Sequence, residues 1–394
     1  MIKAGKRRIL FVPLDWGLGH ATRLVPLIEE AVRCGDEVWI GGNGRSGAWL
    51  KVRFPDLPFE VAPEWTLQHH KHLAWDFLGN LFSFGRGLRA DRRWANQTAE
   101  RLALTHLVSD HRYGLYAKGG SNRTVAVLVL HQVVPALPGL WPWPRLMVAL
   151  SWLLWPWFRL RLRAFDEVWI PDHGDQTKAL APALSHFGGL RNLGLPVRYL
   201  GWQSRWSGLE HGAFVTPAKG EALLVVLSGP EPARSLWEAN LLQQWEDWAG
   251  REDLDRPSAL WLVRGLPDSA APLTPSAPFS SSATLLAPTR FPTFGYWNSP
   301  DDATLSTLMA GAGLIISRPG YSSLMDYAVW NQNMGKPALH LCLVPGQGHS
   351  EQAYLAHKLA TEGQADFQWE RTLNLRDAWM RRKQTMFTYG VNRP

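Results

Sequence analysis

Short apolar runs rich in β-branched residues alternate with longer segments of helical periodicity along the whole chain. Strands are expected in the first half at 8–13, 37–40, 106–109, 124–130 and 167–170. In the second half they are expected at 222–227, 259–263, 314–316 and 338–344, with helices near 232–248, 322–330 and 350–361. This alternation predicts an α/β protein with parallel, doubly wound sheets.

The segment after the first strand has the clearest helical spacing. Leu24, Leu27, Ile28, Ala31 and Val32 fall on one face of a helix. We therefore expect this face to pack against the first sheet.

Chain length favours two domains, because single cores stop growing near about 250–300 residues and this chain has 394. The stretch from Pro196 to Gly220 is rich in Gly, Trp and Pro and lacks periodicity, so we place a linker at 201–220. The expected parts are a first domain at 1–200, a second at 221–370 and a basic helical segment at 371–394. A long surface loop is expected at 267–288.

The net charge of +7 is unevenly distributed. Residues 1–200 hold 25 Lys and Arg against 16 Asp and Glu, whereas 201–394 hold 16 against 18. The surplus of the first half indicates an acidic partner, either nucleic acid or an anionic membrane surface.

The cysteines and the apolar runs indicate the cellular location of the protein. Cys34 and Cys342 lie in different halves within apolar surroundings, so we expect buried, reduced thiols of a cytoplasmic protein. The basic start is followed by too short an apolar run for a secretory signal. The longest apolar run, 146–158, is broken by Pro156 and is shorter than the roughly 20 residues that cross a bilayer.

Two segments of the first half combine bulky apolar side chains with arginines. The run 146–158 follows Trp141 and Trp143 and precedes Arg159, Arg161 and Arg163, and the other segment spans 73–88. This composition fits either a helix lying in a membrane interface or a core helix capped by arginines. We favour membrane contact, because the surplus charge lies in the same half.

A glycine loop, Gly17-Leu18-Gly19-His20, follows the first strand and opens the first helix. Ligands bind at the carboxyl edge of open α/β sheets, and this loop would lie there. A neutral His20 near a helix N-terminus could act as a general base, with Asp15 as the other candidate. The alternative is a histidine that merely caps the helix.

Three further loops of this kind occur in the second half. They are Ser228-Gly229 with Arg234 downstream, the segment 317–326 with Arg318 and Gly320, and 345–352. Glycine at a strand-to-helix turn leaves backbone N–H groups and the positive end of a helix dipole available for a phosphate. Asp326, a turn or two later, could accept both hydroxyls of a ribose. The alternatives are plain turns and solvated arginines.

These motifs together resemble the GT-B glycosyltransferases of family 28, the group that includes the MurG-type enzymes. The resemblance implies two Rossmann-like domains facing across a cleft, the second binding a UDP-sugar and the first an acceptor. On the donor side it implies that Asp326 binds the ribose and that Glu351 and Gln352 bind the transferred sugar. It also implies that Arg318 and Gly320 belong to the loop beneath the nucleotide. On the acceptor side lie His20, Trp16, Gly17, Gly19 and Asp110.

The sequence departs from the family pattern in three places. Asp15, Trp16 and Leu18 stand where the family loop has more glycine, Pro319 and Tyr321 replace small residues, and 329–335 resembles an insertion. The departures in the first loop predict a different acceptor side, so the identity of the acceptor cannot be taken from the family.

The predicted function is inverting, metal-independent transfer of a sugar from UDP to a glycan or lipid-linked acceptor, without a cofactor. The protein would be cytoplasmic and peripheral at the inner face of the membrane. A metal at His69, His70 and His72 is not supported by ligand spacing. The alternatives are a non-catalytic nucleotide-sugar-binding protein and a sugar-nucleotide epimerase. Nucleic acid is not expected, because stacking motifs are missing.

Overall fold

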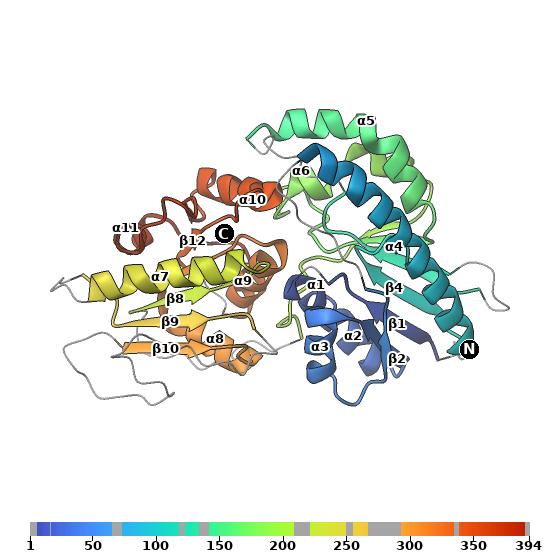
Figure 1. Ribbon diagram of the computed structural model, residues 1–394, viewed down its shortest axis with the longest axis horizontal. Coiled ribbons are helices and arrows are strands. Elements are labelled where there is room, and N and C mark those ends of the chain that lie inside the picture. Colours follow the sequence, from blue (N-terminus) through green and yellow to red (C-terminus); the bar gives the residue numbers. More distant parts are fainter. Residues whose placement is uncertain are drawn as a thin grey trace. The chain divides into compact units, whose positions relative to one another are not determined.

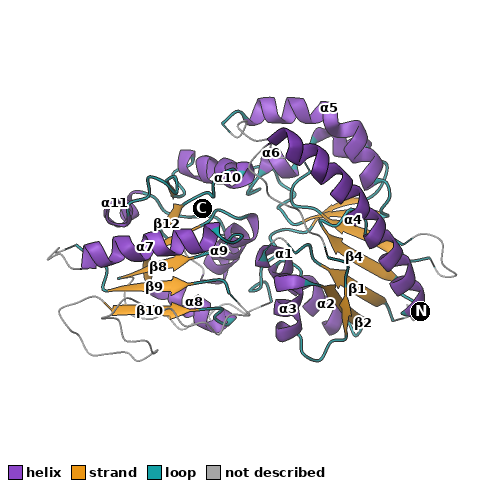
Figure 2. Ribbon diagram, in the orientation of Figure 1, coloured by secondary structure: helices purple, strands orange, loops and turns teal. Residues whose placement is uncertain are grey.

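The chain folds into two compact units (Figures 1 and 2). The first comprises residues 1–135 and 145–203, and the second comprises 136–144 and 204–394. The computed structural model describes 6–15, 17–64, 73–117, 123–133, 142–208, 221–249, 255–266, 293–334 and 339–390. The metal reading of His69, His70 and His72 and the loop expected at 267–288 lie outside these residues, as does Trp16.

The first unit contains a seven-stranded parallel sheet. Its strands are β1 (Arg8–Val12), β2 (Glu37–Gly42), β3 (Phe59–Val61), β4 (His106–Asp110), β5 (Val125–Val129), β6 (Glu167–Ile170) and β7 (Val197–Tyr199). They pair in the order β3-β2-β1-β4-β5-β6-β7. The five predicted strands are confirmed, whereas the three-residue edge strands β3 and β7 are too short to give a pattern.

Helices cover both faces of this sheet. They are α1 (Leu18–Thr22), α2 (Val25–Arg33), α3 (Gly44–Arg53), α4 (Leu73–Arg101), α5 (Pro144–Leu162) and α6 (Pro182–Ser185), with a 3₁₀ turn at Gly188–Asn192. Leu24, Ile28 and Ala31 pack against β1 and β2, as their spacing predicts. Val32 does not join them, since it is 45% exposed and lies at the margin of the apolar stripe.

The second unit contains a six-stranded parallel sheet. Its strands are β8 (Ala222–Val226), β9 (Ala259–Val263), β10 (Thr293–Trp297), β11 (Ala312–Ser317), β12 (Leu341–Leu343) and β13 (Asp366–Phe367), in the order β10-β9-β8-β11-β12-β13. The helices are α7 (Ala233–Ala249), α8 (Asp302–Gly311), α9 (Tyr321–Met334), α10 (Ser350–Thr361) and α11 (Leu375–Arg381), followed by a 3₁₀ turn at Arg382–Gln384. The insertion expected at 329–335 is part of α9 as far as Met334.

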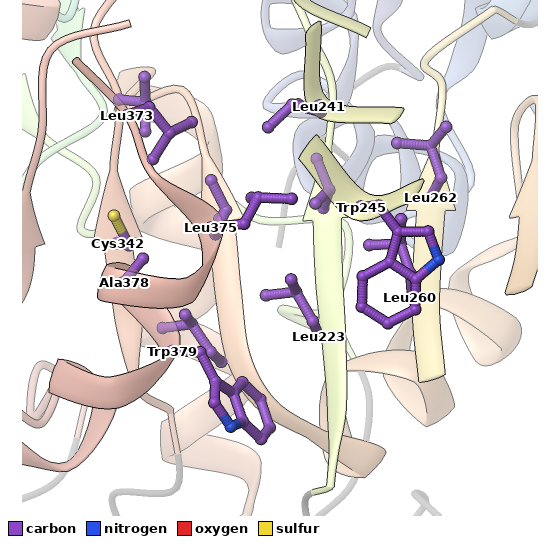
Figure 3. Close-up of a cluster of buried hydrophobic side chains, with 14 of the residues drawn as sticks. Leu223, Leu241, Trp245, Leu260, Leu262, Cys342, Leu373, Leu375, Ala378 and Trp379 are labelled. Carbon is purple, nitrogen blue, oxygen red and sulfur yellow. The ribbon is translucent and has the colours of Figure 1, made fainter. Parts of the chain in front are cut away.

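Tryptophans build much of the second core. The indoles of Trp237, Trp245 and Trp248 on α7 and Trp379 on α11 join leucines of β8 and β9 in one buried cluster. Figure 3 shows Trp245 and Trp379 with several of these leucines. Because Trp379 belongs to this cluster, the segment expected as a separate C-terminal part packs into the second unit.

The residues that follow Gln203 are also part of the second core. Trp206 is fully buried, and its indole Nε1 donates to the Asp302 carbonyl at 3.3 Å. The linker expected at 201–220 therefore includes core residues, and β7 lies within the aperiodic stretch that suggested it.

The two cysteines differ. Cys342 is buried on β12, and burial raises the pKa of its thiol. Cys34 was expected to be buried but is exposed, because it caps the end of α2 outside the apolar face.

Close packing of α3 on β2 requires glycine at position 47. A Cβ there would lie 2.9 Å from the backbone carbon of Gly42. We expect Gly47→Ala to lower the free energy of unfolding of the first unit by about 1–3 kcal/mol in chemical denaturation. Gly85→Ala, in the interior of α4 with nothing within 4 Å of its Cβ, is the matched control. It should raise stability by about 0.5–1 kcal/mol. Equal effects of the two changes would contradict this packing.

Candidate functional site

Each sheet reverses its strand order once, between β1 and β4 in the first unit and between β8 and β11 in the second. At such a reversal the connections leave in opposite directions, and the carboxyl ends of the two strands bound a crevice in which open α/β sheets bind ligands. The candidate residues of both units lie at the carboxyl ends of these four strands, or follow them or the neighbouring strand β12.

In the first unit, the reversal brings His20 and Asp110 together. Gly17, with φ of 113°, turns the chain from β1 into α1, a conformation that side chains with a Cβ rarely adopt. Asp110 is the last residue of β4. Its Oδ1 lies 3.3 Å from His20 Nδ1, although 90 residues separate the two in sequence.

Arg23 joins this pair from the end of α1. Its Nε donates to Asp110 Oδ2 at 2.5 Å and its Nη2 to Oδ1 at 2.6 Å, which is a bidentate ion pair. Nη2 also contacts His20 Nδ1, and Nη1 lies 2.6 Å from His131 Nδ1. Arg23 and Asp110 are only 2% and 0% exposed, so both charges depend on each other.

Two more histidines complete the cluster. His111 directly follows Asp110, and its ring centroid lies 5.4 Å from that of His20 and 4.4 Å from that of His131. Burial, followed by the charges nearby, lowers the pKa of His111 and of His131 well below the usual value. Burial alone would raise the pKa of Asp110, but Arg23 and His20 lower it well below its ordinary range. The cluster therefore combines one anion, one guanidinium and neutral buried imidazoles.

Asp15, the second candidate base, has a different environment. Its Oδ1 accepts from the Ser46 backbone N–H at 2.9 Å, in the first turn of α3. A carboxylate at this position is stabilised by the helix dipole. Gly19, the other acceptor-side residue, has its carbonyl bonded by the Arg23 backbone N–H at 3.4 Å.

In the second unit, three glycine loops lie at the carboxyl edge of the sheet. Ser228 and Gly229 follow β8 and are exposed, with φ of 116° at Gly229. Gly320 directly precedes α9, and the loop 345–349 joins β12 to α10. Because β8, β11 and β12 are adjacent and parallel, all three loops emerge at one edge.

The arginines of these loops bind acceptors within the protein. Arg234 donates to Glu231 and to Glu238, each at 2.5 Å. Arg318 donates to the Val344 carbonyl at 3.0 Å and to Glu370 at 2.8 Å, and its guanidinium lies 3.9 Å from the ring centroid of Trp237. These contacts favour a role in holding the loops, so that backbone N–H groups remain the main candidates for a phosphate.

Asp326 lies on α9 and is 7% exposed. Ser204 Oγ donates to its Oδ1 at 2.6 Å and Arg205 Nε to its Oδ2 at 3.2 Å. Burial raises the pKa of this carboxyl group despite the nearby Arg205 charge. Glu351 and Gln352 occupy the first turn of α10, where Gln352 Oε1 accepts from the Gly346 N–H at 2.8 Å.

The sequence analysis missed Arg23, His111 and His131. Each had a signal, since Arg23 lies one helical turn after His20, His111 directly follows β4, and His131 lies two residues after β5. Their convergence depends on the strand order, which the sequence pattern did not give.

Comparison with solved structures identifies the fold. The calicheamicin glycosyltransferase CalG4 has a TM-score of 0.56 and 14% identity, over 96% of this chain and 90% of that one. UGT2 of Phytolacca americana, complexed with UDP-2-fluoroglucose and pterostilbene, has a TM-score of 0.55 and 14% identity, over 95% and 89%. No protein-family model and no curated protein matches the sequence. The chain has the GT-B glycosyltransferase fold.

Removing the Asp110 charge should destabilise the first unit in a pH-dependent way. At pH 7 we expect Asp110→Asn to cost about 3–5 kcal/mol, because it leaves Arg23 buried without an anion. The lowered pKa means that the contribution of the Asp110 carboxylate is complete above the unfolded value near 4 and is lost as pH falls toward the folded value. Denaturation from pH 3 to 8 should show the two proteins converging only below about pH 4. A difference that stays constant down to pH 3 would contradict the ion pair.

Proposed function

We propose that this protein transfers a sugar from a nucleoside diphosphate to an acceptor hydroxyl group. The observation that carries the proposal is the position of its glycine loops. In a GT-B fold, they lie at the strand-order reversal of each sheet, where backbone N–H groups and helix N-termini gather. Fold alone does not determine function, so the proposal rests on these sites.

The second unit would bind the donor. The loops after β8, β11 and β12, with the N-termini of α9 and α10, would hold the diphosphate. Asp326 would bind the ribose by exchanging its Ser204 and Arg205 contacts for sugar hydroxyls, and Glu351 and Gln352 would face the transferred sugar. UDP as the nucleotide and membership of family 28 rest on the sequence resemblance.

The first unit would bind the acceptor and remove the proton of its hydroxyl group. The acceptor oxygen attacks the anomeric carbon, the bond from that carbon to the diphosphate breaks with inversion, and His20 takes the hydroxyl proton. No metal is required if backbone N–H groups stabilise the leaving diphosphate. His20 is the better candidate base than Asp15, whose carboxylate already binds the start of α3.

Transfer should depend on His20 far more than donor binding does. We expect His20→Gln to lower the transfer rate by about 10²–10⁴-fold, the usual contribution of a general base. Release of UDP from a panel of UDP-sugars, with glycan and polyprenyl acceptors, measures the rate, and calorimetry measures UDP binding. Unchanged transfer by His20→Gln would exclude the role of His20. Binding without transfer or release by the wild-type protein would favour a non-catalytic binding protein, and epimerised donor without release an epimerase.

Helix α5 supports membrane contact by the first unit. Its exposed side chains include Trp152 at 49%, Leu153 at 76% and Leu160 at 70%, and Arg161 follows. Large apolar groups beside arginines suit the interface of an anionic bilayer, which matches the surplus charge of this half. Within the described residues, no helix is both long and apolar enough to cross a membrane. A lipid-linked acceptor would fit this location.

Flotation with anionic vesicles tests the membrane proposal. We expect Leu153→Asp with Leu160→Asp to lower the partition coefficient more than about tenfold, since each buried leucine contributes about 1.5–3 kcal/mol. Leu236→Asp, on α7 and 67% exposed, is the matched control and should float like the wild type. Equal flotation of all three proteins would contradict contact through α5.

A further inference from the structure

Arg23 uses four of its five N–H groups within the His20–Asp110 cluster. Nε and one Nη2 hydrogen bind the two oxygens of Asp110. The second Nη2 hydrogen is directed at His20 Nδ1, and one Nη1 hydrogen at His131 Nδ1. An arginine side chain stays protonated and can only donate, so both histidine nitrogens must be acceptors in these contacts.

This requirement determines where neutral His20 carries its proton. A neutral imidazole has one N–H, and if Nδ1 accepts from Arg23 the proton lies on Nε2. The competing tautomer would place a proton on Nδ1, facing Asp110 Oδ1 at 3.3 Å. Arg23 opposes that form, because it occupies the Nδ1 lone pair and both Asp110 oxygens.

We propose that Arg23 is a positioning residue that holds His20 in the Nε2–H tautomer. In this state His20 presents a hydrogen-bond donor at Nε2, and the His20–Asp110 pair is interrupted by the guanidinium. The assignment follows from the contacts of Arg23 alone, and its catalytic meaning rests on the proposed function.

Three titratable side chains of the cluster around His20 carry no charge. His111 and His131 are neutral because burial lowers their pKa, and Tyr113 stays protonated because burial raises its pKa. Asp110, whose pKa is lowered, is the anion that pairs with the Arg23 guanidinium. Arg23 Nη2 contacts both Asp110 Oδ1 and His20 Nδ1, the same two atoms that a direct His20–Asp110 hydrogen bond would join.

The consequence for sugar transfer is that His20 must change tautomer before it acts as a base. Nε2 can accept the acceptor proton only after it has given its own proton to water, while water supplies a proton to Nδ1, which then donates to Asp110. No net proton is gained in this exchange. Release of Nδ1 by Arg23 would therefore precede proton transfer.

Nitrogen NMR of the full-length protein labelled with ¹⁵N-histidine tests the proposal without any donor or acceptor. Two-bond ¹H–¹⁵N correlations at pH 8.5 distinguish the tautomers, and His20→Gln assigns the signals. We expect the Nε2–H form in the wild type, and a shift to the Nδ1–H form in Arg23→Met, where Asp110 can accept from Nδ1. Arg23→Lys keeps the charge but lacks the planar fork, so it should shift at least part of the population.

The wild-type spectrum alone can overturn the proposal. A dominant Nδ1–H form in the wild type contradicts it, and so does an unchanged tautomer in folded Arg23→Met. If that variant does not fold, the wild-type and Arg23→Lys spectra decide. Absence of sugar transfer would leave the tautomer assignment intact, so the two proposals fail separately.

Discussion

The reversal of strand order in each parallel sheet is the constraint on which the rest of the structure depends. Parallel strands end at the same edge, and a reversal between neighbours opens a gap in the cover of helices there. In the first unit it places His20 next to Asp110. In the second unit it makes the loops after β8 and β11 neighbours, because these two strands are adjacent. Both candidate sites are therefore consequences of topology before they are consequences of side-chain chemistry.

The two sites handle charge in different ways. The first buries an arginine and an aspartate, which is costly unless the pair is fully hydrogen-bonded, and Arg23 meets that condition with contacts to three side chains. In the second, Arg234 and Arg318 bind glutamates of the protein itself. An anionic ligand there would be held chiefly by backbone N–H groups, which carry no counter-charge of their own.

Most of the fold was predictable because buried parallel strands read as apolar runs between helical segments. The clearest patterns belonged to the strands that position both sites, which are β1, β4, β8 and β11. The short edge strands β3, β7 and β13 gave no such pattern, and neither did the five-residue edge strand β10. The prediction of a linker at 201–220 was wrong in part, because a segment without periodicity can still supply core residues, as Trp206 does. His20 and Asp110 were both selected from sequence, but their contact and the role of Arg23 required the strand order. The assignment of donor-side residues remains a prediction.

Hydrogen exchange measured by mass spectrometry, with and without a UDP-sugar, tests the central claim most directly. If backbone N–H groups at the reversal of the second sheet hold the diphosphate, peptides covering 227–234, 317–324 and 345–352 should exchange more slowly when the donor is bound. Ligand-dependent protection that spares all three loops, or that falls only within the first unit, would contradict the account.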